Sequence, residues 1–339
     1  MRIVLHFLLV ILAAVIIHYF NLISYGLGQA KGQMSIIWEA QPIDDYLAND
    51  NVPDSVRVKL LFIEEVRKYA VDSLGLNQSD NYTSIYDQQG EPVLWVVTGC
   101  KPYAFEAKEW RFPVLGSVPY KGFFDKELAA KELLKVEKEG LDAGIRTVGG
   151  WSTLGWFNDP ILSNMLQRSY GDLANLIIHE LVHATVFVRD SVEFNENLAS
   201  FIGDQGALAF MKDRYGIDSE ELKEYQDEQN DERLYIDHIL RGVDTLEVVY
   251  ASMGEMSAGQ KKQKKEAIIQ QIMNSTDTLS LHNGEFLKFI KGQVPNNTYF
   301  MSFLRYRSKQ VILDSIYQDN FNRQIRPFVG YMKEKHPYL

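Results

Sequence analysis

The sequence predicts an α+β fold, with a mainly helical body, a small β-sheet and an apolar helix at the N-terminus. Three features predict it: an almost uncharged N-terminal segment, short apolar runs typical of strands in the first half, and long stretches with helical periodicity after residue 170. The chain has 339 residues, 46% of them hydrophobic, and can bury a substantial core. We therefore expect one domain over residues 51–339, preceded by a linker or N-terminal arm over residues 25–50.

The N-terminal segment, residues 1–24, is predicted to meet a membrane. Arg2 is followed by 28 residues without a charge, and the stretch from Ile3 to Phe20 is apolar except for two histidines. An apolar run of about 18 residues can cross a bilayer and is longer than the usual signal-peptide core. We predict an uncleaved anchor with Arg2 in the cytoplasm and the rest of the chain outside it. The alternative is a cleaved signal peptide and a secreted protein.

The other elements follow from local patterns, because helical periodicity predicts helices, and β-branched or aromatic runs predict strands. The expected helices, besides two around the motif described below, are residues 55–74, 124–141, 218–250, 258–274 and 298–335. The expected strands are residues 93–99 and stretches near 111–118 and 145–152. A small sheet that leads into a mainly helical body is the architecture that these elements predict.

Composition excludes some classes of partner and bond. The net charge is −10 and no basic stripe is present, which makes nucleic acid an unfavourable partner. The basic run KKQKK at 261–265 is interpreted as a solvated helix face. Cys100 is the single cysteine, so no disulfide can form within the chain.

The most informative feature is an HELVH pattern from His179 to His183, inside an apolar run that extends from Leu173 to Val188. A helix that is apolar all round is buried, and burying two imidazoles and a carboxylate is costly unless a partner satisfies them. Four residues apart on a helix, His179 and His183 share one face and can reach one metal ion. In this HExxH pattern the histidines bind zinc and the glutamate, here Glu180, is the general base. Gly171-Asp172 is the expected N-cap.

A catalytic zinc site needs a third protein ligand and an open position. Arg189–Ser191 is expected to form the turn that ends the first helix, and a second helix is expected to begin near Glu193. Glu196 and the small residues Ser200 and Gly203 share one face of this second helix, which allows a close approach to the first. We therefore favour Glu196 as the third ligand.

Two other carboxylates are alternatives for that third ligand. Glu193 could instead place a negative charge at the start of the second helix, and Asp204 could instead accept a hydrogen bond from a histidine ring. Glu193, Ser200 and Asp204 are therefore also candidates for contacts around the metal or with a substrate.

The segment 177–207 (IIHELVHATVFVRDSVEFNENLASFIGDQGA) resembles the motif region of the predicted bacterial aminopeptidase family, a gluzincin-like group of zinc peptidases. Further segments that are similar to this family are residues 25–43, 112–124 and 152–163, and PNNTYF from Pro295. In the family an HExxH motif is followed by an FNE element whose glutamate is taken as the third ligand. The resemblance implies a zincin-like fold, one zinc ion and a peptide substrate. The implied ligands are His179, His183 and Glu196, and the implied base is Glu180.

The pattern also predicts a mechanism. Glu180 is expected to take a proton from the attacking water and to deliver it to the leaving amine. A further donor must stabilise the oxyanion, and position in the sequence does not choose among four candidates. These are Tyr120, Tyr299, Arg305 and Tyr306.

The favoured activity is the removal of N-terminal residues from peptides. Such an enzyme needs an acidic group to hold the α-ammonium of the substrate, and the candidates are Asp159, Glu193 and Asp204. Residues 149–160 are either the lip of the cleft, where Ser152 could contact the substrate, or a turn-rich connector that packs on the core. The alternatives are a membrane-anchored zinc endopeptidase and a zinc-containing binding module without catalysis.

Overall fold

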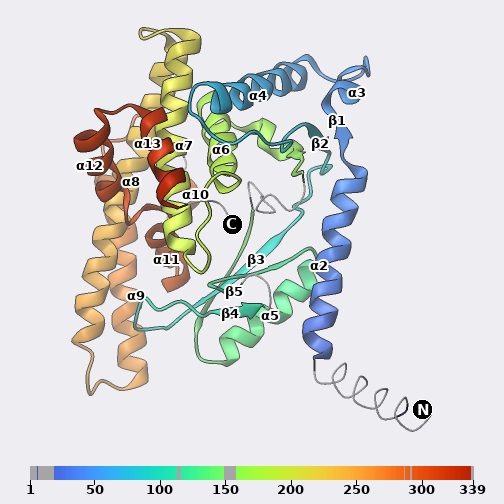
Figure 1. Cartoon of the computed structure of the whole chain (residues 1–339). Coiled ribbons are helices and arrows are strands. Elements are labelled where there is room, and N and C mark those ends of the chain that lie inside the picture. The colour runs from blue at the N-terminus through green and yellow to red at the C-terminus, as the bar shows by residue number, and fades with distance from the viewer. Residues whose placement is uncertain are drawn as a thin grey trace.

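In the computed structural model, which describes residue 6 and residues 19–112, 116–148, 158–285, 287–290 and 292–336, helices dominate and the strands of this part form three small sheets (Figure 1). The expected mixed organisation, mainly helical with little sheet, is confirmed. The α-helices of this part are α2 (Phe20–Glu39), α3 (Ile43–Leu47), α4 (Asp54–Asp72), α5 (Lys126–Lys138), α6 (Tyr170–His183), α7 (Val192–Tyr215), α8 (Glu220–Ala251), α9 (Ala258–Asn274), α10 (Leu287–Ile290), α11 (Asn297–Arg307), α12 (Gln310–Phe321) and α13 (Ile325–Lys335). Its strands are β1 (Gln41–Pro42), β2 (Ser84–Tyr86), β3 (Trp95–Cys100), β4 (Trp110–Phe112), β5 (Gly116–Val118), β6 (Lys121–Phe123), β7 (Asp142–Thr147) and β8 (Ile161–Leu162).

The helices α6 and α7 lie side by side at the centre of the main core, together with α4 and α13 (Figure 1). Their close approach depends on Gly203 of α7. A Cβ atom at this position would lie 2.8 Å from Oδ1 of Asn175 and 3.3 Å from Cβ of His179. One turn earlier on α7, Ser200 is also buried. The close approach that the small residues of α7 predict is therefore confirmed.

The sheet with strand order β6-β3-β7 is antiparallel throughout, and β7 lies at its edge. Helix α11 is tied to this sheet by two asparagines at its N-terminus. The side-chain amide of Asn296 donates to the carbonyl of Ala143 at 2.8 Å, and the backbone N–H of Asn297 donates to the Asp142 carboxylate at 2.8 Å. These bonds fix the start of α11 relative to β7, and so they also fix the direction in which its other end extends.

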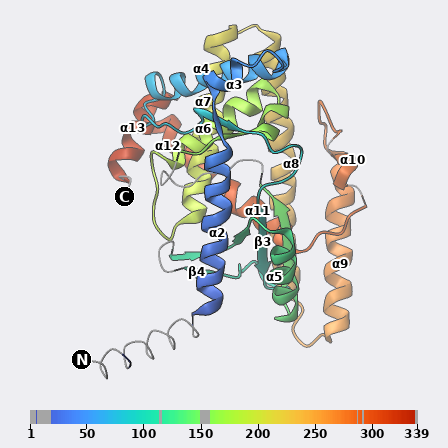
Figure 2. The ribbon, with the colours of Figure 1, turned by 90° about the vertical axis from the view of Figure 1, so that its right-hand side faces the viewer.

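Helix α2 extends along one side of the body (Figure 2). The hydroxyl of Tyr25 donates to the carbonyl of Gly122 at 2.9 Å, and its ring packs against Phe112 and Phe123 with centroid distances of 5.6 and 5.5 Å. Most of the predicted anchor, residues 1–5 and 7–18, lies outside the described residues. No described helix combines the length and the apolarity that a membrane crossing requires.

The predicted ends of the HELVH helix are wrong at both sides. The N-cap is Ser169, whose hydroxyl accepts a hydrogen bond from the backbone N–H of Asp172, rather than Gly171-Asp172. The helix ends at His183 instead of near Arg189. The apolar residues that follow are half-buried or, in the case of Val186, buried, and they are not helical, so hydrophobicity here indicates burial and not helix.

The remaining boundaries agree in part. The helices predicted at 55–74, 124–141, 218–250 and 258–274 correspond to α4, α5, α8 and α9, and the strand at 93–99 corresponds to β3. The stretch 298–335 forms three helices instead of one, because the backbone turns at Ser308-Lys309 and at Asn322, which has a φ of 47°. The predicted strand at 145–152 begins earlier, at Asp142, and residues 149–157 of the expected cleft lip lie outside the described residues.

The contact at Gly203 predicts an unusual response to alanine. Alanine is the better helix former by about 1 kcal/mol, but an added atom in a packed contact typically costs about 1–3 kcal/mol. We expect Gly203→Ala to lower the free energy of unfolding by about 1 kcal/mol, measured by urea denaturation. The matched control is Gly330→Ala in α13, where a Cβ atom would meet nothing within 4 Å, and which should be neutral or stabilising. Equal stabilisation by both substitutions would contradict the close packing of α6 on α7.

Candidate metal centre

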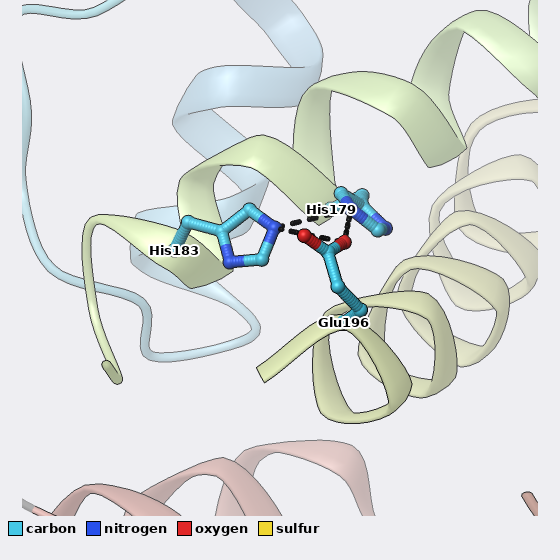
Figure 3. Close-up of side chains that lie close together, drawn as sticks. All are labelled: His179, His183 and Glu196. Carbon is cyan, nitrogen blue, oxygen red and sulfur yellow. Dashed lines mark hydrogen bonds and ion pairs between the residues drawn. The ribbon is translucent and has the colours of Figure 1, made fainter. Parts of the chain in front are cut away.

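Two histidines of α6 form one side of the site. His179 and His183 are one turn apart, and their Nε2 atoms are 3.2 Å from each other (Figure 3). The two rings meet edge to face with a centroid distance of 4.9 Å. Both side chains are largely buried, with 15% and 7% of their surface exposed. The expectation that both imidazoles share one helix face is confirmed.

Glu196 of α7 completes the group. Its Oε2 atom lies 3.4 Å from Nε2 of His179 and 3.5 Å from Nε2 of His183, and the carboxylate points between the two rings (Figure 3). Within the described part of the chain, these three residues are the group whose donor atoms could hold a metal ion, all lying within 4.8 Å of one another. The fold therefore brings Glu196, the carboxylate that the sequence favours as third ligand, to both histidines.

The electrostatics of the group favour a positive charge between the three side chains. Burial alone would raise the pKa of Glu196, but the charges and hydrogen bonds of His183 and His179 outweigh it and hold the pKa well below its usual range. Burial lowers the pKa of His183, and the Glu196 carboxylate more than reverses that effect. A carboxylate in this position is satisfied either by protonated imidazoles or by a metal cation that neutral imidazoles also bind.

Glu180 lies on the same helix but in a different environment. It is buried, with 8% of its surface exposed, and burial raises the pKa of its carboxyl while His179 and His183 partly oppose that shift. Burial, together with the charges of Glu180 and Asp159, raises the pKa of the neighbouring Tyr82 well above its usual value. An increased proton affinity makes this carboxylate a stronger base, which suits a group that accepts a proton.

Asparagines on both sides of Glu196 hold it in place. The side chain of Asn195 makes two hydrogen bonds with the backbone of Val188, accepting from its N–H at 2.9 Å and donating to its carbonyl at 2.8 Å. Asn197 donates to the carbonyl of Arg305 at 2.6 Å and accepts from the backbone N–H of Lys309 at 2.8 Å. The first asparagine fixes the loop between α6 and α7, and the second fixes the end of α11.

Sequence reasoning assigned no role to these two asparagines. Both are polar residues that flank a ligand within a buried helix face, and that pattern could have indicated them.

Side chains of α11 and of the sheet place several hydrogen-bond donors beside the metal centre. The ring of Tyr306 stacks on His179 with a centroid distance of 6.5 Å, and its hydroxyl lies 3.4 Å from a guanidinium nitrogen of Arg146. The guanidinium of Arg305 lies over the ring of Tyr120 at 5.8 Å. Burial, with the charge of Glu196, raises the pKa of Tyr306 to about 12, so this phenol keeps its proton near neutral pH.

Three of the four candidate oxyanion donors are thus near the site, and one is not. Tyr120, Arg305 and Tyr306 are all close enough to Glu196 for its charge to affect their pKa values. Tyr299 shares a hydrogen bond with the hydroxyl of Tyr235, in the separate apolar cluster of α8, α9 and α11. Arg146 was absent from the sequence candidates because nothing local to β7 relates it to α11.

The other candidates have different partners. Glu193 is exposed, accepts a hydrogen bond from Ser308 at 3.0 Å and pairs with Lys309 at 3.3 Å. Asp204 accepts from the side chain of Asn175 at 2.7 Å and forms an ion pair with Arg307.

Asp204, the alternative acceptor for a histidine ring N–H, has Asn175 and Arg307 as its partners instead. Nδ1 of His183 has no hydrogen-bond partner among the described residues. Ser200 is buried one turn beyond Glu196, Asp159 is buried beside Tyr82, and Ser152 lies outside the described residues.

The family model described as "Putative aminopeptidase" matches residues 24–336. The chain belongs to this family. The resemblance carried by the segment 177–207 and by the shorter segments is therefore confirmed at the level of the family. Searches of curated proteins and of solved structures found no match. Membership of this family points to peptide hydrolysis, and the group of His179, His183 and Glu196 is the place where a metal could serve it.

The geometry of the metal centre predicts that zinc binding depends on Glu196 of α7 and not on Glu193 of the same helix. The purified chain incubated with zinc should hold about one ion, because three buried donors converge on one point. Glu196→Ala should lose it, whereas Glu193→Ala, three residues earlier and exposed, should keep it. The zinc content of each variant is measured by mass spectrometry. Retention of zinc by Glu196→Ala together with loss in Glu193→Ala would move the third ligand to Glu193.

Proposed function

We propose that this protein is a zinc-dependent peptidase that removes N-terminal residues from peptides. The observation that carries the proposal is the convergence of His179, His183 and Glu196 next to a buried Glu180, in a chain that belongs to an aminopeptidase family. Two imidazoles and one carboxylate are the protein ligands of many catalytic zinc sites, and three ligands leave a position open for chemistry.

The spacing of the donor atoms supports zinc as the ion. Ligands about 2.0–2.2 Å from a tetrahedral ion are roughly 3.3–3.6 Å from one another. The three separations in this site, 3.2, 3.4 and 3.5 Å, are close to that range. Nitrogen donors from two histidines disfavour calcium and magnesium, which prefer oxygen ligands. Bound zinc supplies Lewis acidity, which polarises a carbonyl group and makes water easier to deprotonate.

The residues of the chain divide the remaining work in the proposed reaction. Glu180 takes the proton from the attacking water and then delivers it to the leaving amine, a role that suits its raised pKa. The negative charge that develops on the carbonyl oxygen needs fixed donors, and the phenol of Tyr306 beside His179 provides one. We therefore prefer Tyr306 to Tyr299 as the oxyanion donor.

The edge strand β7 is the proposed binding surface for extended substrate. It pairs with β3 on one side and occupies the edge of its sheet. Arg146 on this strand contacts Tyr306, which in turn stacks on His179, so the edge reaches the metal centre. Peptides commonly add a strand to such an edge, as in HExxH peptidases of the zincin-like type. Asp159 is the preferred amine anchor, because its charge and that of Glu180 both raise the pKa of Tyr82, so it lies on the same side of the site as the general base.

Substitution of Glu180 separates chemistry from metal binding. Glu180→Gln keeps the size of the side chain but cannot accept the proton, so we expect hydrolysis to fall by about 10²–10⁴-fold, with the zinc content unchanged. The control is Glu247→Gln, an exposed glutamate of α8, which should leave both unchanged. Peptide turnover and metal content are measured on the same samples. Normal turnover by Glu180→Gln would eliminate this mechanism.

Blocked substrates distinguish the modes of cleavage. An enzyme that holds the α-ammonium should release the first residue of a free peptide and should not cleave its N-acetylated form, as followed by chromatography and mass spectrometry of the products. Internal cleavage of the acetylated peptide would indicate an endopeptidase instead. Absence of any cleavage by zinc-loaded protein would favour a binding module.

A further inference from the structure

Arg305 is a buried cation for which the described part of the chain shows no ion-pair partner. Only 6% of its surface is exposed, and its guanidinium lies over the ring of Tyr120 at 5.8 Å. No carboxylate among the described residues forms an ion pair with it, and the residues outside that part include no Asp or Glu. Glu196, whose charge does reach Arg305, already faces the two histidines. A buried charge of this kind is costly unless something compensates it.

A second guanidinium, that of Arg146, lies close to Arg305 and adds to the positive charge there. Arg146 on the edge strand β7 is exposed and has the hydroxyl of Tyr306 at 3.4 Å. Burial lowers the pKa of Arg305, and the positive charge of Arg146 adds to that effect. Two cations that disfavour each other are therefore held on one side of the metal centre, where Glu196 is the one carboxylate among the described residues whose charge acts on Arg305.

The neutral groups beside the two arginines are also donors. Burial raises the pKa of both Tyr120 and Tyr306, so their hydroxyls stay protonated near neutral pH. Two guanidiniums and two phenols together provide hydrogen-bond donors in excess of acceptors. The complementary ligand is a carboxylate, which accepts hydrogen bonds at both oxygens and matches the planar fork of a guanidinium.

The position of this donor cluster limits where the carboxylate lies on a peptide. The ring of Tyr306 is 6.5 Å from that of His179, and its hydroxyl is 3.4 Å from Arg146. The path from the metal centre to Arg146 is therefore no longer than roughly four extended residues, since a chain covers at most about 3.5 Å per residue.

We propose that Arg305 and Arg146 bind a carboxylate of the substrate within about four residues of the scissile bond. The inference rests on the proposed peptidase function and adds a substrate class to it. The carboxylate is either the C-terminus of a short peptide or the side chain of an acidic residue near the cleaved bond. The chemistry is the same in both, and the choice of probes distinguishes them.

The first test compares three probes with the wild-type chain: trialanine, trialanine amide, and Ala-Ala-Glu amide. Loss of a charged hydrogen-bond partner in a buried site reduces binding by about 30-fold or more. We expect kcat/KM for trialanine to exceed that for its amide by at least this factor. Recovery of the higher value by Ala-Ala-Glu amide would extend recognition to acidic side chains, and no recovery would restrict it to the C-terminal carboxylate. Equal values for all three would overturn the carboxylate site while the hydrolysis itself upheld the peptidase.

The second test removes the charge from the protein. Arg305→Met keeps an unbranched side chain of similar length and should bring the ratio of kcat/KM for trialanine and its amide close to one. Arg241→Met, at an exposed arginine of α8, is the matched control and should keep the wild-type ratio. Because the ratio compares two substrates on one protein, a general loss of stability or of oxyanion stabilisation does not change it. An unchanged ratio in Arg305→Met would overturn the proposal.

A binding measurement gives a result that does not depend on turnover. Calorimetry on Glu180→Gln, with and without zinc, should show weaker binding of trialanine amide than of trialanine, and Arg305→Met in the same background should abolish that difference. If no peptide is hydrolysed by the wild type, the proposed function fails, and this comparison alone decides the carboxylate site. Identical affinities for both peptides would then exclude it.

Discussion

The contact between α6 and α7 is the constraint on which the rest of the site depends. His179 and His183 are placed by one helix, but the carboxylate that meets them comes from the other, and it reaches them because Gly203 lets the two helices approach. Buried imidazoles and a buried carboxylate are each unfavourable alone and acceptable together. The metal centre is therefore a product of the packing of α7 on α6.

Hydrogen bonds spread this constraint to the surrounding elements. Asn195 and Asn197 are the sequence neighbours of Glu196, and they attach α7 to the loop after α6 and to the end of α11. At the opposite end of α11, Asn296 and Asn297 attach the helix to the sheet. Helix α11 thus connects the edge strand to the metal centre, which explains how Tyr306 can lie against His179 while Arg146 of β7 reaches Tyr306.

Local features of this site could be predicted from the sequence, and long-range ones could not. Histidines four residues apart share a face in any helix, and the small residues after Glu196 indicate a close helix contact, so the three donors could be named in advance. Tyr299 and Tyr306 are seven residues apart and share a face of α11, so periodicity could not show which end lies near the metal centre. That choice depends on contacts such as the one between Arg146 and Tyr306, which are 160 residues apart. The end of α6 at His183 was missed for a related reason, because tertiary packing covers the apolar residues that follow, partly or fully, without continuing the helix.

Acidic and basic side chains are unevenly distributed around the site, which in the proposed function suits a short peptide. The charges of Glu180 and Asp159 both act on Tyr82, whereas the surroundings of Glu196 include the guanidinium of Arg305 and the phenols of Tyr120 and Tyr306, with Arg146 beside them. A short peptide carries a positive charge at its first residue and a negative charge at its last. In the proposed function, the acidic neighbours attract the amine and the guanidiniums attract the carboxylate, so the uneven charge would orient the substrate before any side-chain contact forms. A site that holds both ends of a peptide needs no deep specificity pocket, because the distance between the two charges already selects for length.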